Sequence, residues 1–109
     1  MLGEEGLKAL RDRMASLLTL YRAPSQFNVV VHLVSMGKPL TIKEISEGLS
    51  LTYKATERAV AKLLEKGLIQ RLPFKEGAYT CDAKQVLLCL LLACADMNIQ
   101  LEKQMKRSS

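Results

Sequence analysis

Residues 39–69 read PLTIKEISEGLSLTYKATERAVAKLLEKGLI, and this stretch decides the fold of the chain. Thr41 and Glu44 have the spacing of a capping box, in which each side chain satisfies a free backbone amide at the start of a helix. Apolar residues three and four apart line one side of the short helix that follows: Ile42, Ile45 and Leu49. Residues 48–51, with Gly48 and Ser50, predict the turn that ends this helix.

A second, longer helix follows the turn. Thr52 can cap its first amides, and Gly67 supplies the left-handed residue that commonly ends a helix. The residues that recur at helical spacing between them are expected to face inward: Ala55, Thr56, Ala59, Val60, Leu63 and Leu64. The stretch therefore predicts two helices joined by a short turn.

A two-stranded hairpin is expected next. Leu68 to Leu72 has the composition of a strand, residues 73–77 (PFKEG) that of a loop, and Ala78 to Cys81 that of the returning strand. Leu40, which precedes the capping box, can add a further short strand.

Helices are predicted on both sides of this unit. An apolar stripe predicts a first helix over about residues 4–22: Leu7, Leu10, Met14, Leu17 and Tyr21. Ala23-Pro24-Ser25 stops it, and we expect the next helix from Ser25, as its cap, to Met36, although Val29-Val30-Val31 alone would suit a strand. Asp82 to Gln85 is another capping box, which predicts a last helix over 83–105 with frayed residues after it.

The predicted fold class is therefore mainly α with a small β-hairpin. A chain of 109 residues is one domain by length, and its 49% of apolar residues can build a core. The order helix, short helix, turn, helix and two-stranded hairpin is that of a winged helix-turn-helix with the hairpin as its wing. We assign residues 25–82 to this unit and the helices at 4–22 and 83–105 to dimerisation.

The net charge of +5 is concentrated in one part of the chain. Residues 52–75 hold six bases against Glu57 and Glu65, a net +4: Lys54, Arg58, Lys62, Lys66, Arg71 and Lys75. A polyanion is the natural partner for such a patch. Charge alone leaves open a solvated basic face without a nucleic-acid partner.

Two stretches carry a resemblance to known DNA-binding proteins. Residues 39–46 (PLTIKEIS) followed by Leu49 resemble the start of the helix-turn-helix of many prokaryotic regulators. Residues 63–69 (LLEKGLI) closely resemble the end of their recognition helix and the first wing strand. The chain is similar to the compact MarR, TrmB and ArsR-like regulators, especially short archaeal ones, over about residues 25–82. This resemblance implies a transcriptional regulator that reads double-stranded DNA.

A recognition helix enters the major groove by its N-terminal part. Lys54, Arg58 and Lys62 are four residues apart and line one face of the predicted helix. Arg58 has the fork geometry that reads guanine, whereas Lys54 and Lys62 are expected to contact phosphates. The predicted DNA-binding residues are Thr52, Tyr53, Lys54, Glu57, Arg58, Lys62, Arg71 and Lys75.

The other members of this set have narrower expected roles. Tyr53 can donate to a phosphate or pack on a sugar. Glu57 would repel the DNA backbone unless it accepts from a cytosine amine or pairs with a neighbouring base. Arg71 and Lys75 are the cations of the wing, where Glu76 opposes them.

The last helix contains a run that is apolar on every side, Val86 to Ala95, and such a helix must be covered all round. We therefore predict a twofold homodimer through the terminal helices, with a buried core helix of a monomer as the alternative. The predicted interface residues are Leu7, Leu10, Met14, Leu17, Leu87, Leu88, Leu91, Leu92 and Ala95.

Other functions find less support in the sequence. A winged helix can also serve as a protein-interaction module or an assembly subunit, and this remains the alternative function. Three signatures of an enzyme are missing from the sequence: a nucleophile with a base, paired carboxylates and a Gly-rich phosphate loop. An aromatic platform for single-stranded RNA is also missing. The sequence contains no separate effector domain, so it gives no indication of a small-molecule partner.

Cysteine and histidine usage predicts neither a metal site nor a cofactor. Cys81, Cys89 and Cys94 form no CxxC pair, and His32 is the only histidine, expected as a half-buried packing residue. The odd number of cysteines indicates a reducing interior. Cys81, just before a helix, leaves open a thiol of low pKa that senses oxidants, although a lone thiol at a strand end is usually inert.

The expected location is the cytoplasm. Glu4 and Glu5 do not suit a signal peptide. The longest apolar run, residues 86–95, is shorter than the ~20 residues that span a bilayer, so no membrane partner is expected.

Overall fold

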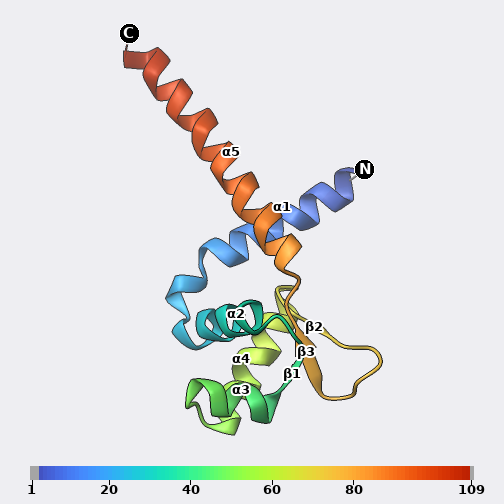
Figure 1. Cartoon of the computed structure of the whole chain (residues 1–109). Coiled ribbons are helices and arrows are strands. Elements are labelled where there is room, and N and C mark those ends of the chain that lie inside the picture. Colours follow the sequence, from blue (N-terminus) through green and yellow to red (C-terminus); the bar gives the residue numbers. More distant parts are fainter. Residues whose placement is uncertain (1–2, 109) are drawn as a thin grey trace.

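The computed structural model describes residues 3–108, and it is mainly helical with a small three-stranded antiparallel sheet (Figure 1). This confirms the predicted mainly α chain with a small β-hairpin. The elements in chain order are α1 (Glu4–Leu18), the 3-10 helix η1 (Leu20–Arg22), α2 (Pro24–Met36), β1 (Leu40–Thr41), α3 (Ile42–Leu49), α4 (Tyr53–Glu65), β2 (Gln70–Arg71), β3 (Ala78–Thr80) and α5 (Ala83–Ser108).

The capping residues form α3 and α4 as predicted. Thr41 accepts from the amide of Glu44 while the Glu44 carboxylate accepts from the amide of Thr41, so the capping box is complete. Thr52 caps α4 by accepting from the amide of Ala55. Gly67 has φ +73°, the left-handed conformation expected just beyond the end of α4.

The core lies where α2, α3 and α4 meet under the sheet. Its buried side chains are Leu20, Val29, Val30, Leu33, Leu40, Ile45, Ala59, Val60, Leu63, Leu68 and Ile69. The inward face predicted for α4 is confirmed, because Thr56, Ala59, Val60 and Leu63 are buried and the other two residues are half-buried. The valine run 29–31 is helical, as expected.

The sheet has the strand order β1-β3-β2, so β1 pairs with the returning strand of the hairpin. The predicted short strand at Leu40 is therefore confirmed. Both hairpin strands are shorter than predicted, because only Gln70–Arg71 and Ala78–Thr80 pair. Leu68 and Ile69 instead lie in the core, where the amide of Leu68 donates to the carbonyl of Leu63 and closes the end of α4.

Three boundaries differ from the predictions. Ser25 does not cap α2, since Pro24 has the fixed φ that suits the first helical position and starts the helix one residue earlier. The first helix ends at Leu18 and continues only as η1. The last helix runs through the basic residues 106 and 107 to Ser108, because cations suit the negative end of a helix dipole. Ser109 lies outside the described residues.

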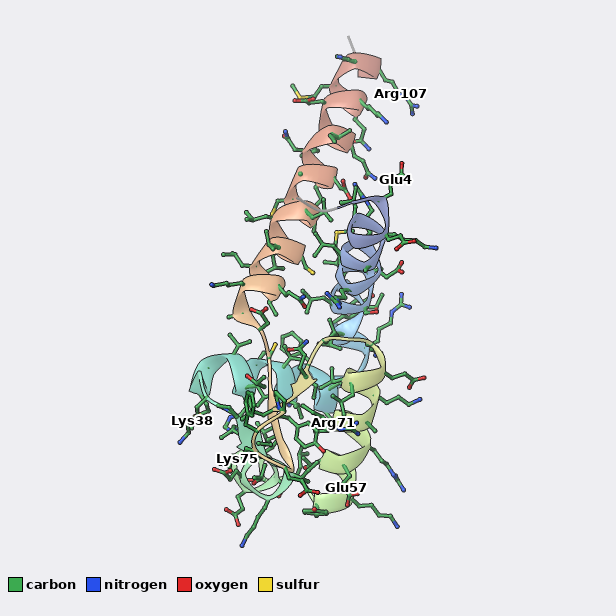
Figure 2. All side chains as sticks on the ribbon, turned by 90° about the vertical axis from the view of Figure 1, so that its right-hand side faces the viewer. Glu4, Lys38, Glu57, Arg71, Lys75 and Arg107 are labelled. Carbon is green, nitrogen blue, oxygen red and sulfur yellow. The ribbon has the colours of Figure 1, made fainter. Side chains whose placement is uncertain are left out.

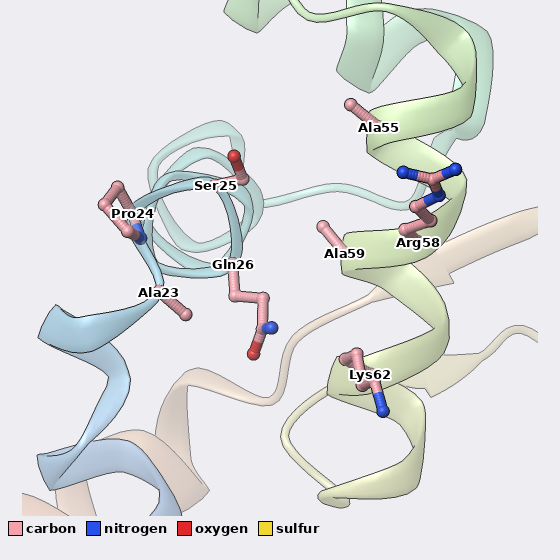
Figure 3. Close-up of a pocket in the computed structure, with 8 residues that line it drawn as sticks. All are labelled: Ala23, Pro24, Ser25, Gln26, Ala55, Arg58, Ala59 and Lys62. Atoms are coloured by element: carbon pink, nitrogen blue, oxygen red, sulfur yellow. The ribbon is translucent and has the colours of Figure 1, made fainter.

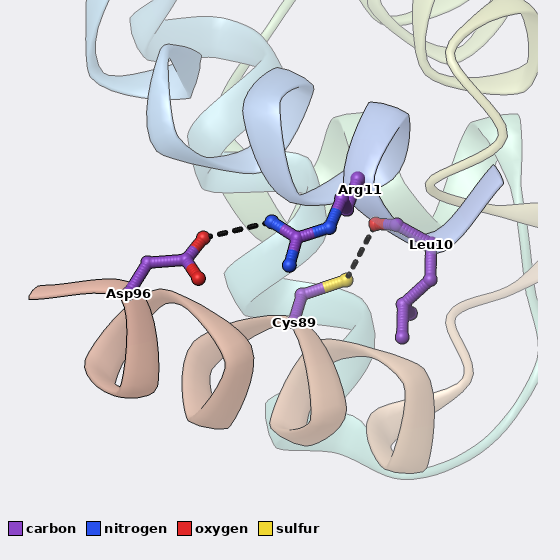
Figure 4. Close-up of polar contacts among 4 residues, drawn as sticks. All are labelled: Leu10, Arg11, Cys89 and Asp96. Carbon is purple, nitrogen blue, oxygen red and sulfur yellow. Dashed lines mark hydrogen bonds and ion pairs between the residues drawn. The ribbon is translucent and has the colours of Figure 1, made fainter. Parts of the chain in front are cut away.

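Helices α1 and α5 pack against each other above the core (Figures 1 and 4). The Arg11 guanidinium donates to the Asp96 carboxylate at 2.9 Å, and the Cys89 thiol lies 4.0 Å from the carbonyl of Leu10. Beyond this contact α5 leads away from the body and gives the molecule a length of 56 Å. An apolar hollow of about 280 Å³ lies among α1, α2 and the start of α5.

By length and composition α5 is a candidate membrane span over Ala83–Arg107, with 11% of its most apolar window buried. The uninterrupted apolar run at 86–95 is too short to span a bilayer, whereas the whole helix is long enough and contains an apolar stretch of 18 residues with at most two charged side chains.

Candidate nucleic-acid interface

The outer face of α4 carries the predicted DNA-binding residues. Lys54, Arg58 and Lys62 are all exposed, and Tyr53 is 56% exposed in the first turn. Among residues 3–108, neither Lys54 nor Arg58 forms a hydrogen bond or an ion pair. Two cations on one helix face are therefore available to an external anion.

Thr52 fixes the end of α4 from which this face begins. Its hydroxyl oxygen accepts from the amide of Ala55 at 3.1 Å, and its carbonyl accepts from the hydroxyl of the buried Thr56 at 2.9 Å. Thr52 is exposed. Its hydroxyl oxygen is committed to the cap, so Thr52 orders the first turn, which carries Tyr53 and Lys54.

One flank of α4 faces the start of α2 across a hollow of about 330 Å³ (Figure 3). Arg58 and Lys62 line it from α4, and Ser25 and Gln26 line it from α2. The first amides of α2 have no side-chain cap, so they add partial positive charge beside the two cations. Ser25 and Gln26 were not predicted as site residues, although Pro24 at the first helical position is the signal that a helix starts there.

The other flank of α4 faces the sheet across a second hollow, of about 270 Å³. Tyr53 and Glu57 line it from α4, and Arg71 and Tyr79 line it from the hairpin strands. Arg71, predicted as a cation of the hairpin, therefore lies beside α4. Tyr79 was not predicted, because its approach to α4 depends on the pairing of β3 with β2.

Two bases of the charged stretch already have partners. The Lys66 ammonium donates to the Gln26 side-chain oxygen at 2.7 Å and ties α4 to α2. Lys62 forms an exposed ion pair with Glu65 at 3.7 Å, and such pairs are weak enough to exchange for another anion. Lys66 is thus a structural residue, whereas Lys62 is still available.

Lys75 lies in the hairpin loop, apart from the α4 group (Figure 2). Hydrogen bonds from Thr41 lower the pKa of the Glu44 carboxyl, and the charges of Lys75 and Lys38 lower it further. The loop therefore brings Lys75 toward the start of α3. Of the eight predicted residues, seven lie on α4, at its cap or beside it, and Lys75 does not.

The predicted interface residues of the terminal helices divide into two sets. Leu10, Met14, Leu17 and Leu92 are half-buried within the single chain. The exposed set is Leu7, Leu87, Leu88, Leu91 and Ala95. Most of the apolar stripe of α1 thus packs within the single chain. Most of the exposed apolar surface of the terminal helices belongs to α5.

The cysteines differ in exposure. Burial, together with the neighbouring Asp82 charge, raises the pKa of the Cys81 thiol to about 11, so this thiol is protonated at neutral pH. That result argues against Cys81 as an oxidant sensor. Cys89 is buried and its pKa is raised by burial, whereas Cys94 is exposed. No three metal-ligating side chains gather among residues 3–108, and His32 is half-buried against Gly48.

Comparison with protein-family models finds no match along the chain, and comparison with curated proteins finds no relative. The resemblance to prokaryotic regulators therefore depends on the motifs at residues 39–46 and 63–69 alone.

Proposed function

We propose that this protein is a winged helix-turn-helix transcriptional regulator that binds double-stranded DNA as a homodimer. In this proposal α3 and α4 form the helix-turn-helix, α4 enters the major groove, and the β2–β3 hairpin is the wing. The element order and the sheet order β1-β3-β2 are compatible with it. The observation that carries the proposal is the pair Lys54 and Arg58, exposed and without partners among residues 3–108, one turn apart on the outer face of α4.

The two flanks of α4 suggest how the helix would be held on a duplex. Arg58 and Lys62 share a hollow with the uncapped start of α2, and backbone amides at a helix start favour phosphate groups. Arg71 on the opposite flank would meet the other edge of the groove. Phosphate contacts on both sides would fix the depth of α4, while Arg58 reaches a base edge.

The test is duplex binding measured by fluorescence anisotropy from about 50 to 200 mM salt, because each phosphate contact contributes about −0.9 to the slope of log K against log salt. Lys54→Ala should weaken binding to every sequence and make the slope shallower by about 1 per site. Arg58→Ala should also relax sequence choice, by about 1–3 kcal/mol of discrimination at one base pair.

Lys103→Ala is the matched control, since it removes one exposed positive charge from the far end of α5. It should leave the affinity within twofold of wild type. Absence of binding at low salt, or unchanged binding by the Lys54→Ala/Arg58→Ala double variant, contradicts the proposal.

A further inference from the structure

The uncovered side of α5 has a regular pattern. Helix α1 takes the side of α5 that holds the buried Cys89 and Ala93 and the ion-paired Asp96. On the opposite side, exposed residues recur at spacings of four, three, four, three and four. These seam residues are Leu87, Leu91, Cys94, Asn98, Leu101 and Met105.

Alternating spacings of three and four are the heptad repeat of a coiled coil. Leu87, Cys94 and Leu101 then occupy d positions, and the other three seam residues occupy a positions. Cys89 and Asp96 fall at f, the position farthest from a partner helix, and α1 packs there. The cover supplied by α1 and the seam are thus on opposite sides of one helix.

We infer that the seam binds the α5 seam of a second copy of this chain as a parallel, in-register coiled coil. This coiled coil would be the geometry of the homodimer in the proposed function, and one of the arguments for it rests on that proposed function. Pairing would cover an apolar surface that the single chain leaves open on α5, where Leu87 is 58%, Leu101 56% and Met105 72% exposed.

Asn98 is the residue that selects the parallel arrangement. A lone asparagine at an a position favours two parallel strands in register, because its amide can hydrogen-bond to the same residue of the partner. In an antiparallel pair an a position faces a d position, and Asn98 would meet Cys94 or a leucine. Its amide would then lose the hydrogen bonds it makes in water.

The exposed apolar surface is extensive. A standard interface takes about 800 Å² from each partner, and the apolar side chains on and beside the seam are each 46–72% exposed: Leu87, Leu88, Leu90, Leu91, Met97, Leu101 and Met105. The whole apolar band, rather than one or two side chains, would leave water.

The direction also fits the proposed function. Helix α5 starts at the body and leads away from α4, which lies near the end of the molecule opposite to the C-terminus (Figure 1). A parallel pair therefore holds both copies of α4 at the same end, where one duplex can meet both. An antiparallel pair would hold them at opposite ends.

A lipid bilayer is the competing partner for α5, since the helix is long and apolar enough to cross one. The packing of α1 disfavours it. Arg11 is ion-paired with Asp96 in the middle of α5. Figure 2 shows Glu4, at the start of α1, level with the middle of α5. Helix α1 carries six charged residues: Glu4, Glu5, Lys8, Arg11, Asp12 and Arg13. A bilayer around α5 would have to displace α1 or bury these charges.

Disulfide cross-linking of the full chain under mild oxidation tests the geometry. The wild type should cross-link through Cys94, and Cys94→Ser should abolish the product. In the Cys94→Ser background, Leu101→Cys should restore a covalent homodimer, because equal d positions face each other within disulfide reach. Lys103→Cys, at an f position, is the control and should stay monomeric on a non-reducing gel. Met105→Cys replaces Leu101→Cys if that variant does not fold.

Other outcomes overturn the inference. Cross-linking only in a mixture of Leu91→Cys and Leu101→Cys chains would mean antiparallel helices. A monomer in sedimentation at micromolar concentration, or flotation with phosphatidylcholine/phosphatidylglycerol vesicles that protects α5 from protease, would exclude the coiled coil. Asn98→Asp should raise the dimer dissociation constant about tenfold at neutral pH through like-charge repulsion.

The experiments distinguish failure of the coiled-coil inference from failure of the proposed DNA-binding function. A parallel dimer that does not bind duplex DNA would retain this inference and contradict DNA binding. A chain that binds DNA with the Lys54 and Arg58 dependence described above but sediments as a monomer would do the reverse.

Discussion

The cap of α4 allows a quantitative test of how the proposed DNA-reading helix is held together. The Thr52 hydroxyl oxygen accepts from the amide of Ala55 at 3.1 Å, at the first turn of the helix that carries Lys54. Thr52→Ala removes this acceptor and leaves the amide of Ala55 to water. The backbone bond from the amide of Thr56 to the carbonyl of Thr52 stays.

The expected loss is about 1 kcal/mol of unfolding free energy, within the 0.5–2 kcal/mol typical of N-cap substitutions to alanine. For a chain of 109 residues this corresponds to a decrease in Tm of about 4 °C. Because Thr52 is exposed, the substitution opens no cavity in the core, and the loss should come from the cap alone.

Urea and thermal unfolding followed by circular dichroism, at one fixed protein concentration, would measure the change. Thr52→Ser is the matched control, since it keeps the accepting oxygen, and its Tm should lie within about 1 °C of wild type. An unchanged Tm for Thr52→Ala, or an equal loss for Thr52→Ser, would refute the assignment of Thr52 to the cap and favour a role in ligand contact alone.

Three further predictions concern other parts of the chain. Because the pKa of Cys81 is about 11, maleimide at pH 7 should leave Cys81 of the native chain unmodified in mass spectrometry and label it only after unfolding, and early labelling of Cys81 would contradict its burial. The pKa of Glu44 is below its ordinary 4.5, so its stabilisation is present above that value and lost as pH falls below it; Glu44→Gln should flatten the acid side of a Tm–pH profile, and a profile identical to wild type would contradict this. An added Cβ at Gly48 would lie 2.6 Å from Nε2 of the half-buried His32, so Gly48→Ala should be less favourable to stability by about 1 kcal/mol in the wild type than in the His32→Ala background; equal effects in the two backgrounds would refute it.

The central elements could be predicted because their signals are local. The Thr41 and Glu44 side chains bond to each other's backbone amides within one turn, and Thr52 and Gly67 mark the two ends of α4 in the same way. Each of these signals needs only four or five neighbouring residues. Long-range packing therefore had little opportunity to change the outcome.

Boundaries were wrong where two local signals competed. Ser25 is a good capping residue, but Pro24 is equally suited to the first helical position, and the helix begins with the proline. Leu68 and Ile69 have strand composition, but burial beside α4 outweighs two more ladder positions. Composition alone does not determine such boundaries, because they depend on which residues are buried in the assembled fold.

The candidate site was predictable in part for the same reason. Helical periodicity alone identifies the outer face with Lys54, Arg58 and Lys62. It does not identify what faces that helix from elsewhere in the chain. Gln26, forty residues away in sequence, binds Lys66 and removes it from the set of free cations, and Tyr79 reaches the α4 flank through strand pairing.

Helix α5 shows why an all-apolar helix cannot be interpreted before its neighbours are known. Its composition is equally compatible with a monomer core, a dimer seam and a membrane span. Cys89 and Ala93 are buried against α1, so this side of α5 cannot contact another partner. The Arg11–Asp96 ion pair shows that α1 covers the same side of α5 as far as its middle. Only then do the remaining residues form a heptad, with Asn98 as its single polar a position between Leu91 and Met105. The position of Asn98 argues for a specific partner helix, because a lipid surface offers its amide no hydrogen bond and a second copy does.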